Sequence, residues 1–88
     1  MTAYKQLIRT FFSEAVGVIR RSKGMTQEEM AEKMRISCRA YGDLERGKYS
    51  FSTIALIFFL LMMDSGEIIE LLEAFRKKVK EMEMRDAA

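Results

Sequence analysis

The sequence predicts an all-α domain of five helices, and three observations support that prediction. Apolar residues recur at spacings of three and four along most of the chain, which is the pattern of helices with one buried face. Thr26, Ser37 and Ser52 each stand just before such a stretch, where a side-chain oxygen can cap the first turn of a helix. The 88 residues are 49% hydrophobic and include no proline, a composition that suits one small domain without long linkers.

The first helix is expected from Tyr4 to about Ser22. Its apolar residues share a predicted inner stripe, formed by Ile8, Phe11, Phe12, Ala15 and Ile19. Three basic residues, Arg20, Arg21 and Lys23, crowd its C-terminal end. They suit the negative end of the helix dipole there and could equally face phosphates.

Two short helices joined by a tight turn are expected between Met25 and Lys48. Thr26 and Glu29 form a T-x-x-E capping box at the start of the first of these helices. Ala31 stands on its apolar face, where two crossing helices come closest and a larger side chain would push them apart.

The second short helix follows a connection at Arg35-Ile36 and is expected at Cys38–Arg46. Ser37 caps it, and Tyr41 and Leu44 point to the core from positions three apart. A glycine ends it, as is usual just beyond a helix C-terminus. The polar residues at the open end of this helix complete the layout of a helix-turn-helix, the unit that places one helix in the major groove of DNA.

The segment resembles the Cro/phage-repressor-like (Xre-type) helix-turn-helix proteins. The matching strings are K-G-M-T-Q-E-E-M-A-E-K-M, I-S and L-E-R-G-K, and a looser likeness extends from Tyr4 to about Asp64. The resemblance implies a compact five-helix domain whose third helix reads DNA. It also implies that Arg20 and Glu45 form a structural ion pair between the first helix and the end of the third.

By position, the resemblance assigns DNA contacts to Gln27, Ser37, Cys38, Arg39, Asp43, Arg46 and Lys48. Gln27 matches a glutamine that contacts a phosphate, and residues 37–39 match the part of the recognition helix that reaches base edges and phosphate. Arg39 is the best candidate base reader, because its guanidinium fork can pair with guanine O6 and N7. Arg46 and Lys48 match polar and basic residues beside the DNA backbone.

Three residues depart from the family pattern. Arg35 stands where the family usually has a glycine with positive φ. An arginine in that conformation carries a strain of order 1 kcal/mol, or else the turn takes another shape. Gly42 lies inside the recognition helix and costs about 1 kcal/mol relative to alanine. Asp43 matches a base-facing position, where it could accept from a cytosine amine but would repel phosphates. These departures weaken the expectation of tight DNA binding more than the expectation of the fold.

The fourth helix, expected at Thr53–Met63, carries ten consecutive apolar residues after its threonine. Ile54, Phe58 and Leu61 occupy places that are normally polar in the family. A helix that is apolar all round must be buried all round. Either the last helix folds over it or a second subunit covers it, and we expect a subunit interface here.

The last helix is expected from Ser65 or Gly66 to about Arg85 and has a second apolar seam with a spacing close to 3.5. It is longer than a domain this small needs, so its final turns are expected to project towards a partner subunit. We therefore expect residues 1–64 to form the helix-turn-helix domain and residues 65–88 to form an amphipathic dimerisation helix of the same domain. The residues expected at the homodimer interface are Ile54, Phe58, Leu61, Phe75, Val79 and Met82.

Composition narrows the classes of function. With no histidine and one cysteine, the chain offers no zinc site, no intrachain disulfide and no Ser/His/Asp or Cys/His set, so neither an enzyme nor a cofactor is expected. The lone cysteine and the absence of a visible secretory signal suit a reducing, cytoplasmic compartment, and ten apolar residues are too few to cross a bilayer.

Residues 1–48 hold ten basic and six acidic residues, whereas residues 49–88 hold five basic and seven acidic residues. The basic half contains the helix-turn-helix, although a charge excess this small would equally suit a solvated surface.

The sequence thus predicts a small dimeric transcriptional regulator, acting as a repressor, that binds double-stranded DNA sequence-specifically. A dimer would read an inverted-repeat operator with half-sites about 34 Å apart. Two alternatives stay open. One is an antitoxin whose apolar helices dock a toxin, and the other is a protein-interaction module that has lost DNA binding.

Overall fold

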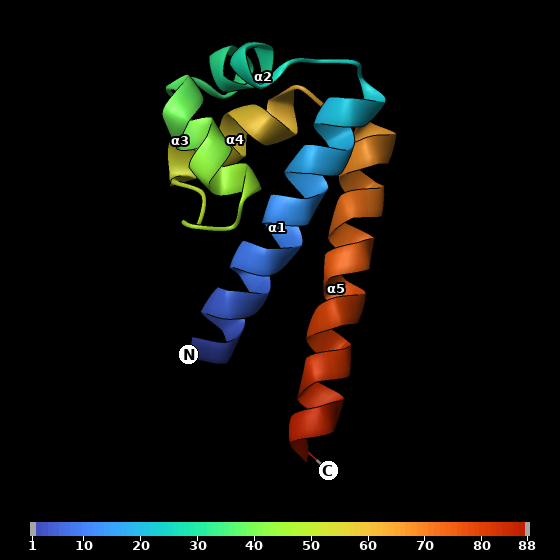
Figure 1. Ribbon diagram of the computed structural model, residues 1–88. Coiled ribbons are helices and arrows are strands. Elements are labelled where there is room, and N and C mark those ends of the chain that lie inside the picture. Colours follow the sequence, from blue (N-terminus) through green and yellow to red (C-terminus); the bar gives the residue numbers. More distant parts are fainter. Residues whose placement is uncertain (1, 88) are drawn as a thin grey trace.

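The computed structural model describes residues 2–87, and over that range the chain forms five helices and no strands. The helices are α1 (Thr2–Ser22), α2 (Gln27–Met34), α3 (Cys38–Glu45), α4 (Thr53–Leu61) and α5 (Ser65–Ala87). The predicted all-α, five-helix class is confirmed. Helices α2, α3 and α4 gather at one end of the molecule, while α1 and α5 run side by side away from them towards the two chain ends (Figure 1). Met1 and Ala88, at the outer ends of the two predicted segments, lie outside the described residues.

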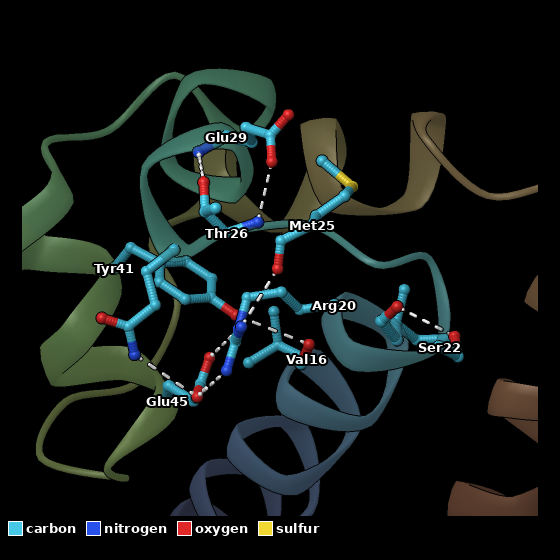
Figure 2. Close-up of polar contacts among 10 residues, drawn as sticks. Val16, Arg20, Ser22, Met25, Thr26, Glu29, Tyr41 and Glu45 are labelled. Atoms are coloured by element: carbon cyan, nitrogen blue, oxygen red, sulfur yellow. Dashed lines mark hydrogen bonds and ion pairs between the residues drawn. The ribbon is translucent and has the colours of Figure 1, made fainter.

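The predicted caps form, which explains where these helices begin. Thr26 Oγ1 accepts from the Glu29 N–H at 3.1 Å, and Glu29 Oε1 accepts from the Thr26 N–H at 2.8 Å, so the capping box closes in both directions (Figure 2). Hydrogen bonding from Thr26 to the Glu29 carboxylate, chiefly from the Thr26 backbone N–H, lowers the pKa of Glu29. Ser37 and Ser52 each accept from the backbone N–H three residues later, at 3.0 and 3.2 Å. Each cap therefore satisfies an N–H group that the helix leaves unpaired.

The core lies where α1 meets the unit formed by α2, α3 and α4. Its largest fully buried side chains are those of Tyr41, Phe59, Met30, Met34 and Val16. The predicted stripe on α1 is partly wrong, because Ile8 is 42% exposed and Val16, which the prediction left out, is fully buried. Helix α1 in fact has two apolar sides. Phe12 and Val16 belong to the core, while Ala15 and Ile19 line a groove against α5.

Helix α5 packs antiparallel along α1 (Figure 1). Aromatic side chains contribute to this contact. The ring of Phe75 lies 5.1 Å from that of Phe11 and 5.5 Å from that of Phe12. Further along, Met82 is only 8% exposed and the Tyr4 hydroxyl donates to Glu83 at 2.8 Å. Within the chain, α1 therefore packs against α5 as far as Met82 and Glu83, while Met84 beyond them is 73% exposed. Contact of these last turns with a partner subunit stays a prediction.

Helix α4 is covered on only one side. Ala55 and Phe59 are buried, whereas Ile54 is 61% exposed and Leu61 is 70% exposed. Phe58 is half-buried, with the Arg35 guanidinium 4.7 Å from the centre of its ring. The apolar helix is thus not enclosed by its own chain. Among the described helices, none combines the length and the apolar character that crossing a membrane would need.

Candidate nucleic-acid interface

The turn between α2 and α3 keeps a left-handed residue at its centre even though that residue is not glycine. Arg35 has φ 62° and ψ 37°, which resolves the two options left by the sequence in favour of the strained, unchanged turn. The Arg35 side chain offsets part of that strain, because Nη1 donates to the Glu32 carbonyl at 2.9 Å and the guanidinium lies over Phe58. The direction in which α3 leaves the turn is therefore the one that a glycine would give.

The end of α3 is fixed to α1 by the predicted ion pair. Arg20 Nε donates to Glu45 Oε2 at 2.8 Å and Nη2 donates to Oε1 at 2.9 Å, so the pair is bidentate (Figure 2). A third guanidinium nitrogen donates to the Met25 carbonyl at 3.1 Å. The hydrogen bonds from Arg20 lower the pKa of Glu45 to about 2. Because both side chains are largely buried, this pair fixes the orientation of α3 far better than a surface ion pair would.

A buried tyrosine forms a second polar contact between α3 and α1. Tyr41 is fully buried, and its hydroxyl donates to the Val16 carbonyl of α1 at 3.5 Å (Figure 2). Burial raises the pKa of Tyr41, so the phenol stays neutral and remains a donor at physiological pH. The inner face of α3 is thus held by apolar packing and by two polar links to α1, which leaves the opposite face free.

Six of the residues that the sequence predicts at the DNA surface are exposed: Gln27, Ser37, Cys38, Arg39, Arg46 and Lys48. Arg39 and Arg46 lie on the outer face of α3, two helical turns apart. Lys48 follows the helix, with Nζ 5.5 Å from the centre of the Tyr49 ring. Gln27, at the start of α2, donates weakly to Glu45 at 3.4 Å, so it stands beside the end of α3. The two short helices therefore bring these polar and basic side chains to one surface.

Ser37 and Asp43 are also engaged by other residues of the chain. The Ser37 hydroxyl accepts from the Ala40 N–H, which occupies one of its lone pairs as the cap of α3. Asp43 is the exception to the exposed set, because its side chain is only 13% exposed and accepts from Arg46 at 2.5 Å. Asp43 is therefore not a free carboxylate at the surface of the recognition helix.

Gly42 is the residue at this surface whose role the sequence did not reveal. It is buried, and a Cβ placed on it would lie 3.3 Å from Arg46 Nη1 and 4.0 Å from Gln27 Oε1. From the sequence, a glycine inside a helix predicts only a lower helix propensity. Here its missing side chain leaves room for the Arg46 guanidinium.

Comparison with known proteins agrees with this geometry. Residues 18–58 match the family model described as Helix-turn-helix, a segment that contains all of α2 and α3 with parts of α1 and α4. Neither the curated proteins nor the solved structures gave a match. The matched family binds DNA through the unit that α2 and α3 form here. Residues 18–58 of this chain thus match the Cro/C1-type, Xre-like helix-turn-helix family, which supports the resemblance noted in the sequence.

Proposed function

We propose that this protein is a small transcriptional regulator, acting as a repressor, that binds double-stranded DNA sequence-specifically as a homodimer. The observation that carries the proposal is the outer face of α3, which presents Arg39 and Arg46 while its inner face is fixed to α1 through Glu45. The retained turn at Arg35 supports the same reading. Arg35 adopts the left-handed conformation of the family's glycine, so α3 follows α2 in the arrangement that a helix-turn-helix uses to enter the major groove.

In the proposed complex, α3 enters the major groove by its N-terminal end. Arg39, one residue after the start of α3, reaches the base edges and pairs with a guanine. The free backbone N–H groups at the starts of α2 and α3 lie where the helix dipoles favour phosphate oxygens. Gln27 and Lys48 flank the recognition helix and contact the backbone on either side, so they set the register without reading the sequence.

We propose that the two subunits meet through α4. Ile54 and Leu61 are the most exposed residues of the set predicted at the interface, and Ile57 between them is 47% exposed. Met82, which was expected in the same interface, is already buried within the chain, and Phe75 is partly buried against Phe11 and Phe12 of α1. A two-fold axis beside α4 would bury its apolar face against the same face of the second copy. In this proposal the helix expected to mediate dimerisation, at residues 65–88, instead packs on α1, so it belongs to the same structural unit as residues 1–64.

The dependence of DNA affinity on salt tests this proposal. Each phosphate that a lysine or arginine neutralises releases counterions, so the affinity for duplex DNA should fall steeply between about 50 and 200 mM salt. The slope should become shallower by about 0.9 in Lys48→Ala, because one phosphate contact is lost. An affinity that does not change over this range would contradict binding through the basic surface of α2 and α3.

A further inference from the structure

The Arg46 guanidinium lies next to the space that Gly42 leaves open. The position of a Cβ on Gly42 is 3.3 Å from Arg46 Nη1 and 4.0 Å from Arg46 Cζ. The other terminal nitrogen, Nη2, donates to Asp43 Oδ1 at 2.5 Å. The Arg46 guanidinium therefore lies next to the backbone of Gly42 and is hydrogen-bonded to the carboxylate of Asp43, the next residue in the chain.

Exposure shows which member of this pair faces outwards. The Arg46 side chain is 67% exposed, whereas the Asp43 side chain is 13% exposed. A ligand that approaches the outer face of α3 would meet the arginine and not the carboxylate. Arg46 also follows Arg39 by seven residues, so their backbone positions lie about 10 Å apart along the same side of the helix.

We propose that Gly42 and Asp43 are positioning residues that hold Arg46 as a fixed phosphate-binding cation, and that Asp43 does not read a base. The inference rests on the DNA binding proposed above. A guanidinium that is already oriented loses less side-chain freedom when it binds a phosphate. Its pairing with Asp43 also neutralises a carboxylate that would repel the DNA backbone if it were free.

The sign of one mutational effect separates this role from simple charge repulsion. Removing a negative charge beside DNA should tighten binding to any sequence if Asp43 acts only through its charge. If Asp43 positions Arg46, Asp43→Ala should instead weaken binding about two- to fivefold, the range expected for loss of a well-placed ion pair. The weakening should vanish when Asp43→Ala is combined with Arg46→Ala, because nothing then remains to be positioned.

Gly42→Ala tests the second half of the same arrangement. The added methyl group should displace the flexible guanidinium and weaken DNA binding, while the melting temperature rises because alanine favours the helix. A loss of affinity in a more stable protein cannot come from damage to the fold. Glu73→Gln is the matched control, since it removes one negative charge from an ion pair of the same spacing on α5.

Affinities are measured with a random-sequence DNA duplex about two helical turns long, and the mobility of the arginine side chains is measured by NMR in the absence of DNA. We expect the Arg46 guanidinium to be more ordered than that of Arg39, and Asp43→Ala to abolish the difference. Equal mobility of the two guanidinium groups in the wild type overturns the inference even if the protein binds no DNA, an outcome that would defeat the proposed function separately. The inference also fails if the wild type binds the duplex and Asp43→Ala binds it equally well or more tightly.

Discussion

Replacement of Glu45 by glutamine should remove most of the polar link between α3 and α1. The pKa of Glu45 lies near 2 instead of the ordinary 4.5, chiefly because Arg20 hydrogen-bonds to the charged carboxylate. One pKa unit corresponds to about 1.4 kcal/mol, so the charged form contributes at most about 3.5 kcal/mol to the free energy of unfolding. The Glu45 side chain is 15% exposed, so solvent screening will reduce the measured change in unfolding free energy below this limit.

The pH dependence of that contribution follows from the direction of the shift. Because the pKa is lower in the folded state than in the unfolded chain, the stabilisation is complete above about pH 4.5 and disappears as the pH falls towards 2. Denaturant unfolding of the wild type and Glu45→Gln should therefore show a large gap in unfolding free energy at neutral pH. The gap should narrow progressively below about pH 4.5.

The exposed pair between Glu73 and Arg76 supplies the control for this experiment. Glu73→Gln removes a carboxylate that is 60% exposed, and it should change the unfolding free energy little at any pH. A gap between the wild type and Glu45→Gln that stays constant from neutral pH to pH 2 would refute the reasoning. It would show that the shape of the side chain, and not its charge, holds α3 in place.

Four further substitutions test the DNA contacts, the packing of α5 and the subunit interface. Arg39→Ala should relax specificity at one base pair of each half-site by about 1–3 kcal/mol, whereas Lys48→Ala should weaken binding to all sequences alike. Affinities for a panel of single-base operator variants check this, and equal uniform losses would make Arg39 a phosphate contact. Phe75→Ala should lower the free energy of unfolding by roughly 2 kcal/mol or more through the lost contacts with α1, which denaturant unfolding measures at low protein concentration. Unchanged stability there would show that α5 does not pack on α1 in solution. Leu61→Glu should shift sedimentation equilibrium to the monomer without loss of helix content, and a dimer that persists would move the interface away from α4.

The features that the sequence predicted well are those set by residues close together in the chain. The capping box of Thr26, the caps at Ser37 and Ser52 and the turn at Arg35 each depend on a few neighbouring residues, and all of them appear in the structure. The ion pair from Arg20 to Glu45 spans a longer separation and came from the resemblance to a known family.

The features that the sequence did not predict depend on a choice among several apolar surfaces. The seam of α5 could have covered α4, met a second copy or packed on α1, and hydrophobic burial alone does not distinguish between these partners. The rings of Phe11, Phe12 and Phe75 favour α1, because they meet at centroid distances of 5.1 to 5.5 Å. The role of Gly42 could not be predicted for a related reason. It depends on where the Arg46 side chain lies in the folded chain, next to the space that a side chain at residue 42 would fill.

Selection of bound sequences from random duplex DNA tests the central claim most directly, because it requires no knowledge of the operator. The account predicts that the full chain enriches an inverted repeat whose half-sites are about 34 Å apart, one helical turn between equivalent bases. It also predicts a guanine in each half-site that loses its enrichment when the selection is repeated with Arg39→Ala. A wild-type pool that remains random after repeated rounds at low salt would contradict sequence-specific binding by α3.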